Sequence, residues 1–467
     1  MNEVTVVILA AGLGTRMKSN RAKVLHQAGG DTLLNHVLRA ALAVAQPEQI
    51  VVVVGHQAAL VKSSVKIDGI RFVEQIEQKG TGHALLCARH VIPERDGLLL
   101  ILNGDGPLLK GSTLSSLLKA QKAAREGGHL LTTEVENPAG YGRIVRNSAG
   151  SIAAIVEDKS ATPDQLAIRE INTGQYLFDG GPFWKHIDEV RPNNAAGEYY
   201  LTDMIEILSR HGYPVRPFLV EDETELLGIN TRAELAVADR ILRTRKNHEL
   251  MLSGVTIENP DSVLIDVDVT VEAETLIGAN AQLRGSTAIG RNCEIGAGSI
   301  LRDCLIEDDV HVLPYVVAQD TRIGKGAWVG PFSRLRQKAD IGEQVHIGNF
   351  VELKNTRMER GAKANHLAYL GDAAVGAATN IGAGSITCNY DGVSKHPTAI
   401  EDGVFVGSNS TLVAPVRLGA GSYIAAGSVI TADVEPDSLA LGRERQVNKP
   451  GWAKKRRETQ TAANKRK

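Results

Sequence analysis

A six-residue repeat of aliphatic side chains runs through the second half of the chain. Three runs keep this spacing without a break, from Ile277 to Leu301, from Ile323 to Leu353 and from Ile400 to Ile430. A helix repeats about every 3.6 residues and an amphipathic strand every two, so neither fits. A period of six is typical of a parallel β-helix, in which each hexapeptide supplies one short strand and one turn. The repeat therefore predicts a solenoid in this half.

The repeat loses its register twice near its end. Leu353 and Val375 are 22 residues apart, which is four more than three hexapeptides, and Thr387 and Ile400 are 13 apart, one more than two. A solenoid accommodates insertions as loops on one face, so we interpret both intervals as loops. Polar and aromatic residues fall in or beside them: His366 and Tyr369 in the first, Asn389 and Tyr390 next to the second. Such side chains on a rigid scaffold indicate a functional site.

The first 230 residues follow a different pattern, in which short apolar runs alternate with helix-like segments. The expected strands are Val4–Ala11, Ile50–Gly55 and Leu98–Leu102, and the expected helices include Thr32–Ala45 and His83–His90. This alternation predicts a Rossmann-like α/β domain with a mostly parallel sheet. Ligands of such sheets bind at the carboxyl ends of the strands, where the loops Gly12–Lys23 and Gly104–Pro107 begin.

A helix is expected between the two halves. Thr231 and Glu234 form the pattern of a capping box, and Leu235, Ala238 and Leu242 share one face. The predicted organisation is a first domain over 1–230, a linker helix over 231–252, a β-helix over 253–442 and a basic tail over 443–467. We expect the tail to be solvated and without fixed structure, because its lysines and arginines come in runs.

Net charge, apolar runs and cysteine content exclude several classes of protein. Among 467 residues the formal net charge is −2, which argues against binding of nucleic acid by the body of the chain. No run approaches the roughly twenty apolar residues of a membrane span, and Val4–Ala11 lacks the basic flank of a signal peptide. The four cysteines form no CxxC pair, so reduced thiols are expected. We therefore expect a cytoplasmic protein without a membrane anchor.

The loop after the first expected strand has the composition of a phosphate site. Gly12 and Gly14 permit a tight turn that turns backbone N–H groups toward a phosphate. Arg16 follows directly and Lys23 comes seven residues later, so two cations accompany these amides. Displacement at phosphorus needs such neutralisation of charge. The GK[ST] ending of a P-loop is missing, which excludes that motif.

The motif LAAGLGTRM…KVLH closely resembles the signature of sugar-1-phosphate nucleotidyltransferases. Together with the hexapeptides, the chain resembles the bacterial bifunctional N-acetylglucosamine-1-phosphate uridyltransferase and glucosamine-1-phosphate acetyltransferase family. The resemblance runs from about residue 4 to about residue 445. It includes EQKGTGHA (77–84), NGDGPL (103–108), GYGRI (140–144), INTG (171–174), NHLAYLGDA (365–373), NIGAGSITCNYDG (380–392) and FVGSNSTLVAPV (405–416).

The resemblance implies uridylyl transfer from UTP in the first domain. Arg16 and Lys23 would stabilise the transferring phosphoryl group, and Mg²⁺ would be held by Asp105 and Asn230, whose oxygens are hard ligands. The implied contacts to UDP-N-acetylglucosamine are Leu9, Ala10, Ala11, Gly12, Lys23, Gln75, Gly80, Thr81, Gly142, Glu157, Asn172 and Asn230.

For the second domain the resemblance implies N-acetylation of glucosamine 1-phosphate by acetyl-CoA. His366 would be the general base, since the pKa of an imidazole lies near neutrality. Sugar-phosphate contacts would come from Arg336, Lys354, Tyr369 and Asn380, and acetyl-CoA contacts from Ala383, Asn389, Tyr390, Ser408, Ala426 and Arg443. The family also implies left-handed coils, a homotrimer and a product used for peptidoglycan and envelope precursors.

Two alternative functions fit parts of the pattern. An enzyme of the same architecture could use TTP and glucose 1-phosphate, and a non-enzymatic regulatory subunit of a translation-initiation exchange factor could keep both folds. A regulatory subunit that catalyses no reaction would not need this combination of residues: Arg16, Lys23, Asp105, Asn230 and His366. The chain departs from the family pattern at Ala22, where proline is usual, and at Asn103 and Gly106.

Overall fold

The computed structural model describes residues 4–92, 96–124, 126–192 and 197–464. They form two compact units. Unit 1 comprises Met1–His248 with Ile265–Val267, and unit 2 comprises Glu249–Leu264 with Asp268–Lys467. The short piece 265–267 belongs to unit 1 because the N–H of Val267 donates to the carbonyl of Gly29, and buried Asp266 pairs with Arg243 at 2.8 Å.

Unit 1 is built on a nine-stranded sheet whose main path runs β11-β7-β10-β6-β1-β4-β5. Strands β6, β1, β4 and β5 are parallel neighbours, whereas β10 is antiparallel to both β6 and β7. The hairpin β8–β9 extends from β10. The strands are β1 (Val4–Ala10), β4 (Ile50–Val54), β5 (Arg71–Glu74), β6 (Leu98–Asn103), β7 (Gly128–Glu134), β8 (Arg143–Arg146), β9 (Ile152–Val156), β10 (Glu170–Asp179) and β11 (Val215–Leu219). The prediction of an α/β fold is confirmed.

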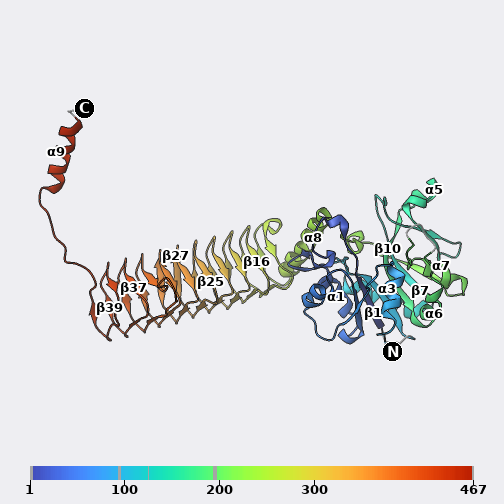
Figure 1. Cartoon of the computed structure of the whole chain (residues 1–467), viewed down its shortest axis with the longest axis horizontal. Coiled ribbons are helices and arrows are strands. Elements are labelled where there is room, and N and C mark those ends of the chain that lie inside the picture. Colours follow the sequence, from blue (N-terminus) through green and yellow to red (C-terminus); the bar gives the residue numbers. More distant parts are fainter. Residues whose placement is uncertain (1–3, 93–95, 125, 193–196, 465–467) are drawn as a thin grey trace. The chain divides into compact units, whose positions relative to one another are not determined.

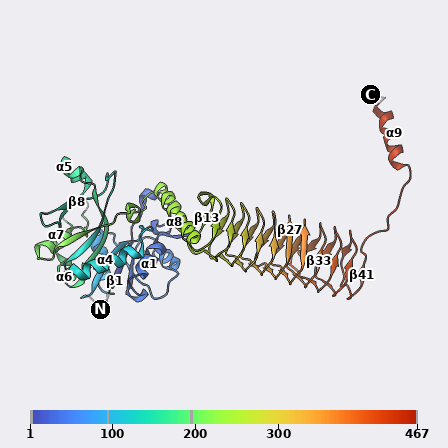
Figure 2. The same ribbon diagram turned by 180° about the vertical axis from the view of Figure 1, so that it is seen from behind.

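Helices cover both faces of this sheet. Alternate residues of β1, such as Val6 and Ile8, pack with α1 (Leu33–Leu42) and α4 (Gly111–Ala124), which lie side by side in Figure 2. Val7 faces the other way, toward α3 (Thr81–Ala88), α6 (Gly180–His186) and α7 (Asp203–Arg210). Because successive side chains of a strand point to opposite faces, a fully apolar run such as Ile50–Val54 requires this three-layer arrangement.

Local signals fix where the helices of unit 1 begin. Thr32 caps α1, its hydroxyl accepting from the N–H of Asn35. The capping box before α8 (Arg232–Leu252) is present, since Thr231 Oγ1 accepts from the N–H of Glu234 and the Glu234 carboxylate accepts from the N–H of Thr231. Ala238 and Leu242 are buried on the predicted face of this helix.

Unit 2 is a left-handed parallel β-helix with three sheets of eleven, ten and nine strands. Its coils follow one another from β12 (Thr256–Ile257) to β41 (Leu439–Ala440). Figure 1 shows them along β16 (Gln282–Arg284), β25 (Arg334–Arg336), β27 (His346–Asn349) and β37 (Thr411–Val413). The aliphatic residue of each hexapeptide points inward and stacks on its counterpart one coil away, for example Leu335 on Leu353. All three predicted runs are buried in this way.

The interpretation of the first register break as an inserted loop is wrong. The inward positions after Leu353 are Met358, Ala364, Leu370 and Val375, so the 22 residues make four sides of the coil, two of them one residue short. His366 therefore ends a strand, β30 (Lys363–His366), and Tyr369 begins the next, β31 (Tyr369–Gly371). Alanine at position 364 hides this register in the sequence, because it stands where a larger aliphatic residue is expected.

The second register break is a true insertion, but a longer one than predicted. Strands β34 (Ile386–Cys388) and β35 (Thr398–Ile400) lie on adjacent sides of the coil. The 13-residue interval from Thr387 to Ile400 is therefore one step between inward positions, where two hexapeptides were predicted. The extra residues fold back on themselves, with Tyr390 bridged to Lys395 in antiparallel fashion. This excursion from the scaffold carries Tyr390 and Lys395 at one edge of the prism.

The tail contains regular structure, contrary to the expectation of an unstructured end. Helix α9 spans Trp452–Asn464. Lysine, arginine, glutamate, glutamine and alanine dominate this segment, and their high helix propensity explains its conformation. In the part of the chain that the structure describes, no helix is long and apolar enough to cross a membrane. All four cysteines are free, and Cys293 and Cys304 are buried.

Asp31 gives the fold a testable pH dependence. Burial alone would raise the pKa of this carboxyl, but hydrogen bonds from Asn35 and the N–H of Thr32, with the charges of Lys66 and Arg39, lower it overall. A lowered pKa in the folded state means that the stabilisation is complete above the unfolded value of about 3.9 and is lost as the pH falls through the folded value.

We expect Asp31→Asn to lower the Tm by several degrees at pH 7, because weakened buried hydrogen bonds cost about 1–3 kcal/mol. The difference from the unmodified protein should shrink as the pH falls below about 4. Thermal unfolding followed by circular dichroism at both pH values measures it. The exposed Asp68→Asn is the matched control, and an Asp31→Asn deficit that stays equal at both pH values would contradict the argument.

Candidate active sites

A cavity of about 620 Å³ opens at the carboxyl ends of β1, β5 and β6. The loop after β1 forms one wall, and residues that follow β5 and β6 form others. The residues predicted to contact the nucleotide and the two predicted metal ligands all line this cavity: Leu9, Ala10, Ala11, Gly12, Arg16, Lys23, Gln75, Gly80, Thr81, Asp105 and Asn230. The structure thus brings this whole set together.

Glycine at position 14 allows the loop after β1 to fold against Lys23. Gly14 has a φ of 62°, and a Cβ atom at this position would lie only 2.6 Å from the Cβ of Lys23. A larger residue would push the two segments apart as well as strain the backbone. The close approach of the loop to the lysine stem therefore depends on this glycine.

Lys23 is the centre of a charged cluster in the cavity. Its ammonium forms an ion pair with Asp105 and donates to Asn230 Oδ1 at 2.7 Å. The Arg16 guanidinium donates to the same amide oxygen at 2.8 Å. Two cations from the loop after β1 therefore meet two oxygen-bearing side chains from two other segments, beside the backbone of the glycine loop.

A second cavity of about 800 Å³ adjoins the first, since Leu9, Thr81 and Asn103 line both. Glu157 and Asn172 also line it, whereas Gly142 lies close beside them. A Cβ atom on Gly142 would come within 3.5 Å of both Glu157 Oε1 and the Cβ of Asn172. The three predicted sugar contacts are thus gathered at one place, although they come from three different segments.

Several lining residues escaped the sequence analysis. Gln78 donates from Nε2 to the carbonyl of Ala11 at 2.7 Å, which ties two loops of the first cavity together. The position of Gln78 inside the family motif EQKGTGHA could have identified it from the sequence. Tyr200 lines both cavities, but no motif or spacing marked it.

In unit 2, His366 lies one coil away from Asn349. The Nδ1 atom of His366 is 3.0 Å from Asn349 Oδ1, and the two residues are register partners in adjacent strands. An amide oxygen accepts only, so this contact places the proton on Nδ1 and leaves Nε2 as an acceptor. His366 is exposed, which leaves it accessible to a substrate. Asn349 was not singled out from the sequence.

A cluster of charged residues lies on the neighbouring side of the same coils. Lys354 donates to Asp372 at 2.9 Å, and Arg336 is the register partner of Lys354 one coil earlier. Asp372 raises the pKa of Lys354, and Lys354 in turn lowers the pKa of Lys395. Lys395, on the excursion, lines a cavity of about 390 Å³ with Lys354 and Asp372. Such crowding of ammonium groups favours a bound anion.

The remaining predicted residues of unit 2 lie farther along the coils. Tyr369 and Asn389 approach each other at Gly371, where a Cβ atom would meet the Tyr369 hydroxyl at 2.5 Å and Asn389 Nδ2 at 2.9 Å. Asn380 is one coil beyond Lys363 of β30. Lys395 was not predicted from the sequence, because the excursion that carries it is longer than the register break indicated.

Four of the six predicted acetyl-CoA residues, Ala383, Ser408, Ala426 and Arg443, follow one corner of the β-helix, whereas Asn389 contacts Asp372 and Tyr390 lies on the excursion. The N–H of Asn409 donates to the carbonyl of Ala383, and that of Gly427 donates to the carbonyl of Ser408. Ala383, Ser408 and Ala426 therefore occupy equivalent positions in successive coils. Arg443 comes next, its side chain 3.9 Å from where a Cβ atom of Gly427 would lie.

Comparison with known proteins covers both halves. Residues 6–165 match the MobA-like NTP transferase domain, residues 268–303 and 320–355 match the bacterial transferase hexapeptide (six repeats), and residues 397–432 match the hexapeptide repeat of succinyl-transferase. The bifunctional protein GlmU of Solibacter usitatus (strain Ellin6076) is 54% identical over 454 residues, 97% of each chain. The chain belongs to the bifunctional GlmU family.

Other GlmU relatives agree. The protein of Koribacter versatilis (strain Ellin345) is 47% identical over 458 residues, 97% of each chain. That of Streptococcus agalactiae serotype V (strain ATCC BAA-611 / 2603 V/R) is 44% identical over 450 residues, covering 96% of this chain and 97% of its own. The chain is therefore a bifunctional transferase that acts on small molecules, with uridylyltransferase and acetyltransferase activities.

The departure from the GlmU pattern at Ala22 leaves the loop in a proline-like conformation. Ala22 has a φ of −55°, close to the value that proline imposes. Its N–H, which proline would lack, donates to Gln57 Oε1 at 2.8 Å. A hydrogen bond thus replaces the covalent ring as the restraint on the segment before Lys23.

Proposed function

We propose that unit 1 transfers a uridylyl group from UTP to N-acetylglucosamine 1-phosphate, within residues 1–230. An oxygen of the sugar phosphate attacks the α-phosphorus of UTP in line, a new P–O bond forms, and the bond to pyrophosphate breaks. No covalent enzyme intermediate is required, so positioning and charge neutralisation supply the catalysis. The observation that carries the proposal is the meeting of Arg16 and Lys23 beside the glycine loop.

Within this proposal the first cavity holds the nucleotide and the second holds the sugar. The backbone of Leu9, Ala10, Ala11 and Gly12 cradles the phosphates, with the Lys23 ammonium neutralising developing charge. Gln75, Gly80 and Thr81 contact the uracil. Gly142, Glu157 and Asn172 contact the N-acetyl sugar, which the adjoining cavity accommodates.

Asp105 and Asn230 fit a Mg²⁺ ion. Both present oxygens, which are the hard donors that Mg²⁺ prefers, and Mg²⁺ commonly takes only one or two protein ligands beside phosphates and waters. The two oxygens already share one cation, the Lys23 ammonium. The ion would supply neutralisation of phosphate charge when bound, while Lys23 moves to the phosphates.

We further propose that unit 2 acetylates glucosamine 1-phosphate, within residues 253–442, before uridylyl transfer. His366 takes a proton from the amine through Nε2 as the nitrogen attacks the acetyl carbon of acetyl-CoA. A C–N bond forms, the C–S bond breaks, and the proton passes to the departing thiolate. Asn349 holds the tautomer that makes Nε2 the base.

Cations on the side of the coils next to that of His366 support the binding of a sugar phosphate. Arg336 offers a guanidinium fork and Lys354 a point charge, with Tyr369 and Asn380 completing the contacts. We add Lys395 to this set, because it shares a cavity with Lys354. Acetyl-CoA would lie along the corner column, contacting Ala383, Asn389, Tyr390, Ser408, Ala426 and Arg443.

A homotrimer and a cytoplasmic location complete the proposal, with UDP-N-acetylglucosamine as the product for peptidoglycan and envelope precursors. An exposed aromatic column on unit 2 supports the trimer. The rings of Tyr315, Phe332 and Phe350 stack in successive coils, with centroids 5.2 and 5.7 Å apart, and each residue is about half exposed. Burying this column against another copy would remove apolar surface from water.

Replacing the proposed base separates the two activities. We expect His366→Ala to lower the kcat of acetyl transfer by about 10²–10⁴-fold, the usual contribution of a general base, and to leave uridylyl transfer unchanged. His346→Ala, an exposed histidine on β27 (His346–Asn349), is the matched control and should retain both. Equal loss of both activities in a folded His366→Ala protein would contradict the separation of the sites.

Replacing the proposed metal ligand has the opposite effect. We expect Asp105→Ala to lose Mg²⁺-dependent uridylyl transfer and Mg²⁺ binding measured by isothermal titration calorimetry with UTP present, while acetyl transfer persists. Because calorimetry measures Mg²⁺ binding directly, this result does not depend on the rate of uridylyl transfer. Unchanged Mg²⁺ affinity in Asp105→Ala would remove this residue from the metal site without touching the assignment of the reaction.

A further inference from the structure

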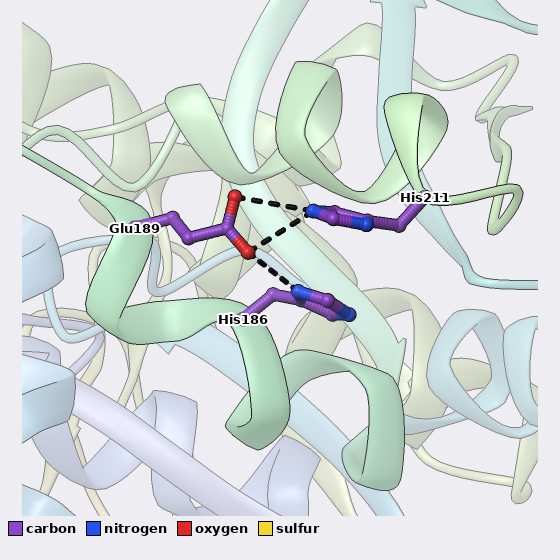
Figure 3. Close-up of side chains that lie close together, drawn as sticks. All are labelled: His186, Glu189 and His211. Carbon is purple, nitrogen blue, oxygen red and sulfur yellow. Dashed lines mark hydrogen bonds and ion pairs between the residues drawn. The ribbon is translucent and has the colours of Figure 1, made fainter.

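Two histidines and a glutamate lie together on unit 1 and take no part in the sites described above. His186 ends α6, Glu189 ends the following 3₁₀ turn η5 (Ile187–Glu189), and His211 directly follows α7. Figure 3 shows both rings presenting a nitrogen to one carboxylate. His186 Nδ1 is 2.6 Å from Glu189 Oε1, and His211 Nε2 is 3.0 Å from the same oxygen and 3.1 Å from Oε2.

We infer that His186, Glu189 and His211 bind one transition-metal ion of the zinc class. Imidazole nitrogen and carboxylate oxygen are the ligands that Zn²⁺ and its neighbours accept, and two histidines with one glutamate make a recurrent three-ligand set. Three protein ligands leave the fourth position to water. The three ligand atoms already lie within 4.8 Å of one another.

Little movement separates the present arrangement from a metal-bound one. Zinc bonds of about 2.1 Å at tetrahedral angles place neighbouring ligand atoms about 3.4 Å apart. The nitrogen-to-oxygen distances here are 2.6 and 3.0 Å, as expected when protons occupy these contacts. Replacing the protons by an ion requires the nitrogen-to-oxygen pairs to open by less than about 1 Å, and the stacked imidazole rings to rotate until both nitrogens point at the ion.

The three side chains stand on a rigid base with an open outer side. Ile187, between the two ligands His186 and Glu189, is fully buried, and Leu208 of α7 packs into the same core. His186 is itself buried, at 7% exposure, whereas the side chains of Glu189 and His211 are each 41% exposed. The core fixes the spacing of the ligands, and the exposed side admits the ion and its water.

Both histidines stand where a bound cation is favoured. His186 and His211 both stand at helix C-termini, where backbone carbonyls carry partial negative charge. The two rings stack with centroids 3.8 Å apart and an interplanar angle of 20°. One ion held by two neutral rings would satisfy both helix ends.

Isothermal titration calorimetry of the full chain with ZnCl₂ tests the inference. Excess Mg²⁺ is kept in the buffer so that the carboxylates of the nucleotide site are occupied by a cation that imidazole does not bind well. We expect one saturable Zn²⁺ site per chain. His211→Ala and Glu189→Gln should weaken it at least tenfold, and His248→Ala, an exposed histidine of α8, should leave it unchanged.

Thermal unfolding provides a second readout. Zn²⁺ should raise the Tm of the unmodified protein and of His248→Ala, but not of His211→Ala, because an ion that binds only the folded state stabilises it. Circular dichroism without metal establishes that the variants are folded. Zn²⁺ binding that is absent, or that is equal in His211→Ala and Glu189→Gln, would overturn the inference and leave the cluster as a hydrogen-bonded tie between α6 and α7.

Discussion

The stacking of one aliphatic side chain per hexapeptide sets the position of the functional groups on the coils of unit 2. Each inward residue lies on its counterpart one coil away, as Leu353 lies on Leu370, so a residue at a given place in one coil stands beside its equivalent in the next. His366 reaches Asn349 for this reason, and Lys354 stands one coil beyond Arg336. The interior packing therefore does more than stabilise the prism, because it aligns side chains far apart in sequence into columns on its surface.

In unit 1 the edge of the parallel sheet, and not a stack of coils, brings functional side chains from distant segments together. The strands β1, β5 and β6 end at one edge of the sheet, and the loops that leave them carry Gly12, Gln75 and Asp105 into one cavity. Asn230 comes from the segment before α8 and closes the set by accepting from both Arg16 and Lys23. In unit 1 the regular elements fix the backbone and the loops supply most of the site, whereas in unit 2 the strands themselves carry His366, Lys354 and Arg336.

Much of this arrangement could be predicted from the sequence. Strand alternation, the capping box at Thr231 and the hexapeptide period are local signals, and each led to the observed element. The motif residues of the nucleotide loop also gathered as expected. The register between Leu353 and Val375 was misread because side length in a β-helix varies by one residue, and Ala364 weakened the pattern where it mattered.

What escaped prediction depended on contacts between distant segments. Asn349 carries no motif signal, and only the coil register brings it to His366. Lys395 required knowledge of how the excursion folds back, and Tyr200 required the sheet and the loops together. His186 and His211 are 25 positions apart and belong to no recognised motif, so the packing of α6 on α7 alone reveals their pairing.

The central claim is that one chain carries out two reactions in a fixed order. An omission assay on purified protein tests it most directly, supplying glucosamine 1-phosphate, acetyl-CoA, UTP and Mg²⁺ and leaving out one component at a time. We expect UDP-N-acetylglucosamine only with all four, and its recovery without acetyl-CoA when N-acetylglucosamine 1-phosphate is the substrate. Uridylylation of N-acetylglucosamine 1-phosphate with no acetylation of glucosamine 1-phosphate would contradict it, leaving unit 2 without the reaction assigned to it.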